Sequence, residues 1–239
     1  MSNNCEQPAF ALYGMASPNV RKITIMLAEV EQPFRFHHID VFRGGQFTSA
    51  FERLNPNRKV PVLVDHRSDS TAPTVIFESA AILIYLAEQF SVLLPRAGTA
   101  RTATLQWLMI QACNMGPLLG QLNHFQFAAR EGNDYAFTRY HREAERLYRL
   151  LDDRLAQHPY LGGDASSIAD IATYPWTLYL ERHGFEAEAV PHLDTWRQTI
   201  AERPAVMKGL QAIARVETAD AAAFEAATQH ERARFFGKV

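Results

Sequence analysis

The stretch Asn57-Arg58-Lys59-Val60-Pro61-Val62-Leu63 and the later Phe77-Glu78-Ser79 decide the fold of the first half of this chain. Val60 to Asp65 and Thr74 to Phe77 are short apolar runs that predict two strands joined by a polar loop. Pro61 has no N–H, and a cis bond before it would turn the backbone N–H and C=O of Val60 outward. Glu78 and Ser79 stand just before an apolar helical run, so free N–H groups there can hold a carboxylate. The two features together suit a small acidic peptide.

The segments around this stretch predict a mixed sheet with helices on both faces. Working back toward the N-terminus, the chain shows a helix over 47–54, a strand over 34–39, a helix from about Val20 and a strand at Phe10 to Tyr13. The order β-α-β-α-β-β-α is the thioredoxin-like arrangement. We expect this domain to span residues 9–92, with Pro95 and Gly98 marking a linker.

The second half is helical throughout, and we expect an all-α bundle over residues 101–225. Helices are predicted over 102–115, 135–156, 192–202 and 205–216. The Ala-rich, polar segment 219–239 is expected to form a loose helical tail, of which 226–239 lies outside the bundle. Ser167-Ile168-Ala169-Asp170 matches a capping box with Asp170 in the third helical position, so we assign Asp170 a structural role.

Composition narrows the function classes. With 239 residues, 47% hydrophobic and 21% charged, the chain is of ordinary globular type, and its net charge of −2 favours neither a nucleic acid nor a membrane partner. Two cysteines, Cys5 and Cys113, cannot build a disulfide framework, which favours a cytoplasmic protein. Cys113 falls on an apolar helix and is expected to be buried. The nine histidines show no metal-ligand pattern, so no metal is expected.

A Val-Pro before the third strand, Glu-Ser before the third helix and Ser-Ile-Ala-Asp in a helical second half together resemble the cytosolic glutathione transferases, over roughly residues 10–210. Ser17-Pro18-Asn19, Gly44-Gly45-Gln46-Phe47 and Thr104-Leu105-Gln106-Trp107 are similar to the bacterial nu-class, Ure2-like group. Members of that group act as glutathione-dependent disulfide-bond reductases. The resemblance implies glutathione as the cosubstrate, room for two glutathiones per subunit, and a homodimer.

The resemblance also implies which residues act on the thiol. Ser17 and Asn19 stand at the start of the first helix, where a hydroxyl, an amide and free N–H groups can all donate to a thiolate. A Ser-Pro-Asn triplet could equally be a simple helix cap, and the two roles are compatible. Tyr13 is the runner-up, since tyrosine-type transferases use a Tyr at the end of the first strand. No cysteine stands at this helix start, so glutathione itself would be the nucleophile on a disulfide.

The remaining glutathione contacts follow from the same resemblance. Val60 would pair its backbone with the cysteinyl unit and Pro61 would hold that geometry; Glu78 would accept from the γ-glutamyl ammonium and Ser79 would hold its carboxylate. Gln46 and Lys59 would meet the glycyl carboxylate or nearby peptide groups. Arg139 would contact glutathione from the second domain.

Three functions stay open at this point. The first is a glutathione-dependent disulfide-bond oxidoreductase acting on glutathione disulfide or another small disulfide. The second is a transferase that joins glutathione to small hydrophobic electrophiles in the same groove. The third is a non-catalytic glutathione-binding regulator, which is disfavoured because the thiol-stabilising positions are present and no long Asn/Gln-rich extension is seen.

Overall fold

The computed structural model describes residues 8–67 and 72–238. Cys5 therefore lies outside the described residues. The chain divides into two compact units, the first made of residues 1–82 and 208–239 and the second of residues 83–207. Within the described ranges, no helix combines the length and the apolar character needed to cross a membrane.

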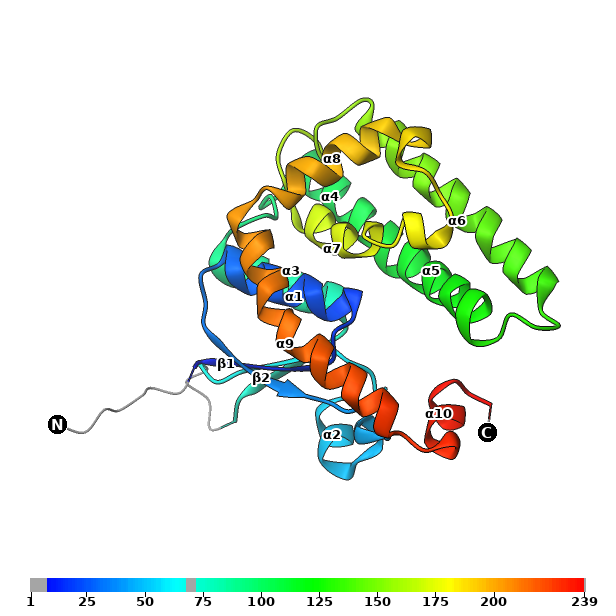
Figure 1. The fold of residues 1–239 in the computed structure, drawn as a ribbon. Coiled ribbons are helices and arrows are strands. Elements are labelled where there is room, and N and C mark those ends of the chain that lie inside the picture. Colours follow the sequence, from blue (N-terminus) through cyan, green and yellow to red (C-terminus); the bar gives the residue numbers. More distant parts are fainter. Residues whose placement is uncertain (1–7, 68–71, 239) are drawn as a thin grey trace. The chain divides into compact units, whose positions relative to one another are not determined.

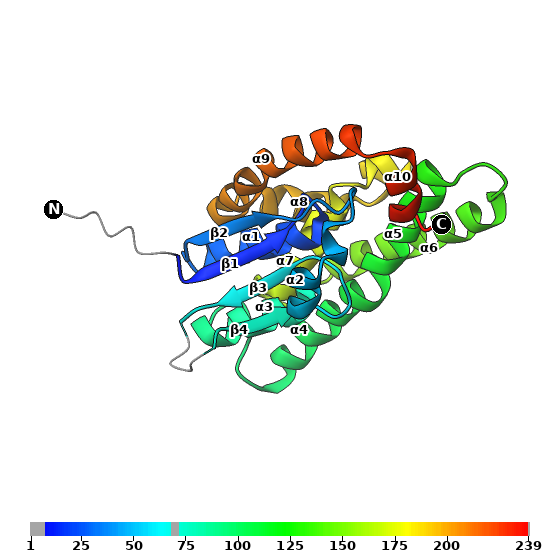
Figure 2. The same cartoon turned by 90° about the horizontal axis from the view of Figure 1, so that it is seen from below.

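The first unit contains a four-stranded mixed sheet in the order β2-β1-β3-β4 (Figure 2). Its strands are β1 (Phe10–Gly14), β2 (Phe34–His38), β3 (Val62–Asp65) and β4 (Thr74–Phe77). β1 runs parallel to β2 and antiparallel to β3, and β4 is antiparallel to β3. Every residue of the central β3 is buried, whereas the edge strand β4 is largely exposed. The mixed sheet predicted from the sequence is confirmed.

Helices of the first unit lie on both faces of the sheet, with α1 (Pro18–Glu29) on one face and α2 (Ser49–Leu54) on the other (Figure 1). Ser17 caps α1, because its side chain accepts from the N–H of Val20, and Pro18 occupies the first helical position, where its missing N–H is harmless. A Cβ on Gly14 would come within 2.8 Å of the Val20 side chain. Glycine at the end of β1 therefore lets α1 begin directly against the strand.

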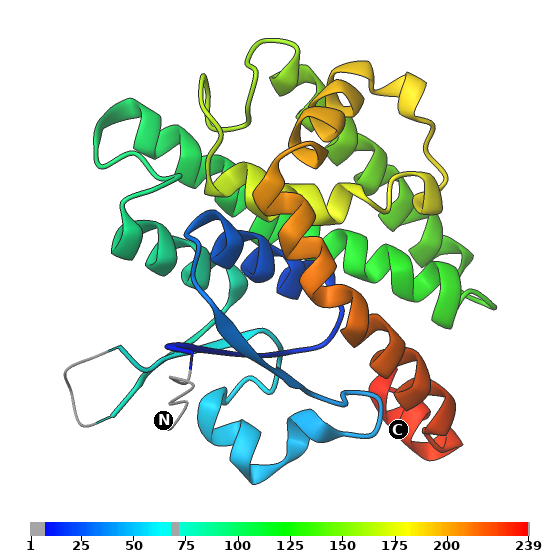
Figure 3. The same cartoon turned by 60° about the vertical axis from the view of Figure 1, so that its left-hand side comes forward.

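The C-terminal region differs from the prediction. Instead of ending near residue 216, α9 (Pro204–Ala226) continues for ten more residues, and a short helix α10 (Gln229–Phe235) follows it (Figure 3). A Cβ on Gly209 would lie 2.5 Å from the Ile25 Cα, so α9 packs against the backbone of α1. Thr228 and Glu231 form a capping box that starts α10. The C-terminal tail is helical over its described part, as expected, but it is not loose, because Phe235 of α10 packs against Phe42. The domain limits 9–92 and 101–225 stay a prediction.

The second unit is helical, as predicted. It holds most of α3 (Ser79–Phe90), then α4 (Gly98–Ile110), the π-helical η2 (Gln111–Met115), α5 (Gly116–Asn123), the π-helical η3 (His124–Ala128), α6 (Asp134–Leu155), α7 (Ile168–Thr177), the short 3-10 turns η4 (Glu181–His183) and η5 (Ala187–Ala189), and α8 (Pro191–Ala201). Every residue of α7 is buried, and α7 contacts both α4 and α8. This helix is the centre of the second unit.

A buried carboxylate fixes the start of α7. Asp170 is fully buried and accepts from the N–H groups of Leu161 and Ser167, the Ser167 hydroxyl and the Trp196 indole N–H, all at 2.9 Å. The capping box predicted at Ser167 is confirmed. Burial raises the pKa of Asp170, while the four hydrogen bonds act in the opposite direction. Asp170 therefore joins α7, α8 and the preceding loop, which is the structural role expected for it.

Candidate functional site

The strand register brings the candidate residues of the first unit to one end of the sheet. Tyr13 pairs with His37 on one side and Val62 on the other, and Val62 pairs with Phe77. The chain segments that leave this row are the Val60–Pro61 segment, the Glu78–Ser79 segment and the loop that leads to α1. The first two adjoin paired residues directly, and Ser17 follows the paired Gly14 by three residues, so all three segments leave the sheet at the same edge.

The start of α1 presents donors at this edge. Ser17 and Asn19 are both half-buried. The Ser17 oxygen accepts from the Val20 N–H at 3.4 Å, and its own O–H donates to no group among the residues described. A hydroxyl that accepts one hydrogen bond can still donate another. The helix cap and a donor role toward a bound sulfur are therefore compatible.

Tyr13, the runner-up, is held at the end of β1. Its ring stacks on His37 with centroids 4.5 Å apart and an angle of 10° between the planes. The pKa of His37 is lowered by burial and, to a smaller extent, by the charges of Arg35 and His66. The stack fixes the Tyr13 ring by packing and leaves its role toward sulfur a prediction.

The Val60–Pro61 bond is cis, as expected from the sequence. The turn before it is organised by Asn55, which is buried, donates from Nδ2 to the Lys59 C=O at 2.7 Å and accepts from the Asn57 N–H at 2.9 Å. Lys59 is itself exposed. Asn55 is a positioning residue that sequence reasoning missed, although an Asn followed by Pro-Asn is a common turn signal.

Glu78 has an unusual backbone conformation, with φ of 67° in the left-handed region. A non-glycine residue rarely adopts it, and such residues cluster at functional sites. Glu78 is exposed, and its carboxylate accepts from Asn57 Nδ2 at 3.4 Å. Ser79 follows at the first position of α3 and its oxygen accepts from Lys22 Nζ at 3.2 Å.

Lys22 is the residue at this edge whose part the sequence did not suggest. It is 1% exposed, and burial lowers its pKa to about 7 against an opposing effect of the Glu78 charge. A signal was present, because Lys22 precedes the buried Ile25 and Met26 by three and four residues and therefore shares their helical face.

Gln46 lies in η1 (Gly45–Phe47), in the loop that follows β2. It is 8% exposed, and its Oε1 accepts no hydrogen bond from the residues described. A buried acceptor without a donor is costly, so this oxygen suits a donor from a ligand or from water.

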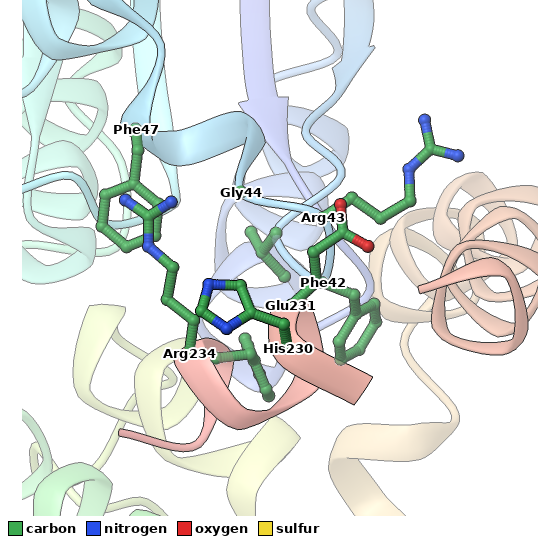
Figure 4. A pocket seen from close by; sticks show the side chains of 9 residues that line it. Phe42, Arg43, Gly44, Phe47, His230, Glu231 and Arg234 are labelled. Carbon is green, nitrogen blue, oxygen red and sulfur yellow. The ribbon is translucent and has the colours of Figure 1, made fainter. Parts of the chain in front are cut away.

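The outer side of this loop is covered by α10, with a small hollow of about 100 Å³ between them (Figure 4). The Phe235 ring lies 4.8 Å from that of Phe42, and the Arg234 guanidinium stacks 4.0 Å above the ring of Phe47. Phe42 also meets Phe224 of α9 at 5.2 Å. The C-terminal helices therefore support the loop that carries Gln46.

The other candidates belong to the second unit. Arg139 lies on α6, and its contact with glutathione stays a prediction. Cys113 was expected to be buried, and this was wrong: it is exposed, and it lies in the π-helical segment η2, of which only Gln111 and Met115 are buried. Within the described part of the chain, no group of three or more histidine, cysteine or acidic side chains is placed to hold a metal ion.

Comparison with known proteins identifies the two halves. Residues 16–89 match the family model of the glutathione S-transferase N-terminal domain, and residues 124–204 match that of the C-terminal domain. The chain is 43% identical over 200 residues to the disulfide-bond oxidoreductase YfcG of Escherichia coli, covering 83% of this chain and 93% of the relative.

Solved structures agree. A glutathione transferase family member from Pseudomonas fluorescens with two glutathiones bound has a TM-score of 0.80 and 35% identity, covering 87% of this chain and 95% of that one. A glutathione transferase from Pseudomonas putida with one glutathione disulfide per subunit has a TM-score of 0.78 and 34% identity, covering 88% and 93%. The family resemblance seen in the sequence is thus confirmed: the chain belongs to the glutathione S-transferase family.

Proposed function

We propose that this protein is a glutathione-dependent disulfide-bond oxidoreductase of the nu-like type. The observation that supports it best is the meeting, at one edge of the sheet, of the start of α1 with Ser17 and Asn19, the segment before β3 at Val60, and the start of α3 at Ser79. We propose that these supply the thiol donors, the backbone pairing and the carboxylate site, respectively. The name of the Escherichia coli relative, a disulfide-bond oxidoreductase, favours reduction over conjugation.

Each part of glutathione has a partner in this proposal. Val60 pairs its backbone with the cysteinyl unit beside Pro61, Glu78 accepts from the γ-glutamyl ammonium, and the Ser79 N–H and hydroxyl hold the γ-glutamyl carboxylate. Gln46 and Lys59 serve the glycyl end. The unpartnered Gln46 Oε1 supports its assignment, because the glycyl peptide N–H is a donor that could reach such an acceptor.

The reaction needs glutathione as its thiolate. The Ser17 hydroxyl and the Asn19 amide would donate to sulfur, and the positive end of the α1 dipole would lower the thiol pKa further. The thiolate attacks one sulfur of a disulfide, forming a mixed disulfide and releasing one thiolate. A second glutathione attacks the glutathione sulfur of that mixed disulfide, giving glutathione disulfide and the second thiol. Two glutathiones are oxidised and one disulfide is reduced.

The second glutathione is supported by the Pseudomonas fluorescens structure, which holds two. Arg139 is proposed as the second-domain contact to glutathione, on the family resemblance alone. We further propose a cytoplasmic homodimer. An open groove along α4 and η2, lined by Trp107 and Met109 of α4 and Cys113 of η2, supports an interface there. Sedimentation as a 27 kDa species would remove the dimer from the proposal.

The test compares two activities of the purified chain. With glutathione present, we expect reduction of 2-hydroxyethyl disulfide to be well above conjugation of 1-chloro-2,4-dinitrobenzene, at matched substrate concentrations. Faster conjugation would replace the oxidoreductase by a transferase that uses the same groove. Tight glutathione binding with neither activity would instead support a non-catalytic regulator.

A further inference from the structure

Lys22 is a buried lysine placed directly behind the proposed carboxylate site. It lies on α1 and is 1% exposed, whereas lysine is almost never fully buried unless it is paired. Its Nζ donates to the Ser79 Oγ at 3.2 Å. The amine therefore reaches from the middle of one helix to the first residue of another.

The charge of Glu78 offsets only part of the effect that burial has on the pKa of Lys22. Glu78 is the carboxylate whose charge raises the pKa of Lys22, and burial outweighs it. On α9, Glu217 pairs with Arg21 at 2.6 Å, and Asp220 pairs with His38 at 2.7 Å and accepts from the Ala16 N–H at 2.6 Å. These α9 carboxylates pair with other groups. A further negative charge near Ser79 would stabilise the Lys22 ammonium, because burial outweighs the charge of Glu78.

We propose that Lys22 is a positioning residue for the γ-glutamyl end of glutathione: its ammonium orients the Ser79 hydroxyl and places a positive charge behind the ligand carboxylate. The inference rests on the proposed function, in which Ser79 holds that carboxylate. A serine oxygen that accepts from an ammonium keeps its O–H free to donate outward, toward the ligand. Charge-assisted hydrogen bonds of this kind are stronger than neutral ones.

Binding and protonation of Lys22 are then linked. In the free protein the amine titrates near neutral pH, because its pKa is about 7. A bound carboxylate raises that pKa, so the complex takes up protons between the free and the bound pKa. Affinity is greatest where Lys22 is already protonated, below about pH 7, and falls as the pH rises through the window above it.

Titration calorimetry with S-methylglutathione measures this linkage. The thioether has no thiol, so no thiol proton is released on binding. Titrations of the full chain between pH 6 and 8.5, in phosphate and in Tris, give the number of protons exchanged, since the two buffers differ in ionisation enthalpy. We expect uptake that grows above pH 7 toward about one proton.

Lys22→Met removes the amine at similar volume, and Lys208→Met makes the same change at an exposed position of α9 as a control. Lys22→Met should abolish the uptake and weaken binding at pH 6.5 by about 10–100-fold, the worth of a hydrogen bond to a charged group. In turnover, its KM for glutathione should rise while kcat at saturating glutathione changes little. Lys208→Met should match the unaltered protein in all three.

Two results would count against different claims. If the unaltered protein binds S-methylglutathione without taking up protons, the role of Lys22 is overturned. The same follows if Lys22→Met keeps both the proton uptake and the affinity. Either result leaves the proposed function intact. No binding by the unaltered protein would overturn the glutathione site itself. At pH 7 the amine of Lys22 is half-protonated in the free protein, whereas the γ-glutamyl ammonium of the ligand is still largely protonated. The proton count of the unaltered protein at pH 7 therefore reports Lys22 without a variant and remains decisive even if Lys22→Met does not fold.

Discussion

Replacing Lys22 by methionine is expected to remove a pH-dependent part of the free energy of unfolding. Burial lowers the pKa of Lys22 from 10.5 to about 7 in the folded chain, whereas in the unfolded chain the amine is exposed to water. Between these values the unfolded state binds more protons than the folded state, so stability rises with pH across the window and is lost again as pH falls toward 7. Each pH unit inside the window is worth about 1.4 kcal/mol.

The expected magnitude follows from these two values. Between pH 7 and pH 9 the Lys22 contribution grows by about 2 kcal/mol, because the amine of the folded protein is half-charged at the first pH and almost neutral at the second. Lys22→Met should not show this rise. Near pH 7 it should also be the more stable protein, since methionine brings no charge into the buried site.

Urea unfolding followed by tryptophan fluorescence at pH 7, 8 and 9 measures the effect, with Lys208→Met as the matched exposed control. The quantity to follow is the difference in unfolding free energy between the unaltered protein and Lys22→Met, which cancels the other titrating groups. Parallel pH profiles, within about 0.5 kcal/mol, would refute the account of Lys22 as a buried amine with a lowered pKa. If Lys22→Met is more stable than the unaltered protein but binds glutathione more weakly, Lys22 serves ligand binding and lowers the stability of the fold.

The remaining predictions concern the thiol site, the α7 start and α10. Asn19→Ala should lower turnover by about 10–10³-fold, as for the loss of one charge-stabilising donor, with a smaller effect on glutathione affinity. If Asn19→Ala keeps its rate and Tyr13→Phe loses it, the thiol-stabilising role belongs to Tyr13. Asp170→Asn should lower the free energy of unfolding in urea by about 3 kcal/mol, because an NH2 group would face donors that now meet a carboxylate. Asp164→Asn, at an exposed position, is the control. A loss below about 1 kcal/mol would contradict the stabilising role given to the Asp170 hydrogen bonds. Phe235→Ala should raise the KM for glutathione several-fold at unchanged kcat by loosening the loop of Gln46; an unchanged KM would show that the loop holds without α10.

Local signals account for much of what could be predicted. Ser17 caps α1 with Pro18 at the first position, and Ser167 with Asp170 forms the capping box, because these interactions join residues two or three apart in the chain. The strands could also be predicted from the sequence, because a period-two or short apolar pattern bounded by turn residues is a local signal of a strand. The mixed sheet and the helical second half follow from the order of these elements.

Other features depend on contacts between distant segments. α9 runs past residue 216 partly because Asp220 meets His38 and the Ala16 N–H from nearly the whole length of the chain away. Cys113 is exposed although the stretch of sequence around it is largely apolar, because burial depends on which face of the segment packs against other helices. The loop of Gln46 gains its support from Phe235, far along the sequence.

The amino-acid sequence by itself determined the family, the order of elements and the set of residues proposed to meet glutathione, because short motifs at fixed spacing carry that information. Only the tertiary structure decided that a buried lysine with a lowered pKa lies at this edge of the sheet. Lys22 lies behind Ser79 because α1 and the start of α3 pack side by side, and burial there changes its pKa. Burial is a property of the packed chain, so the electrostatics of the site could not be read from the order of residues alone.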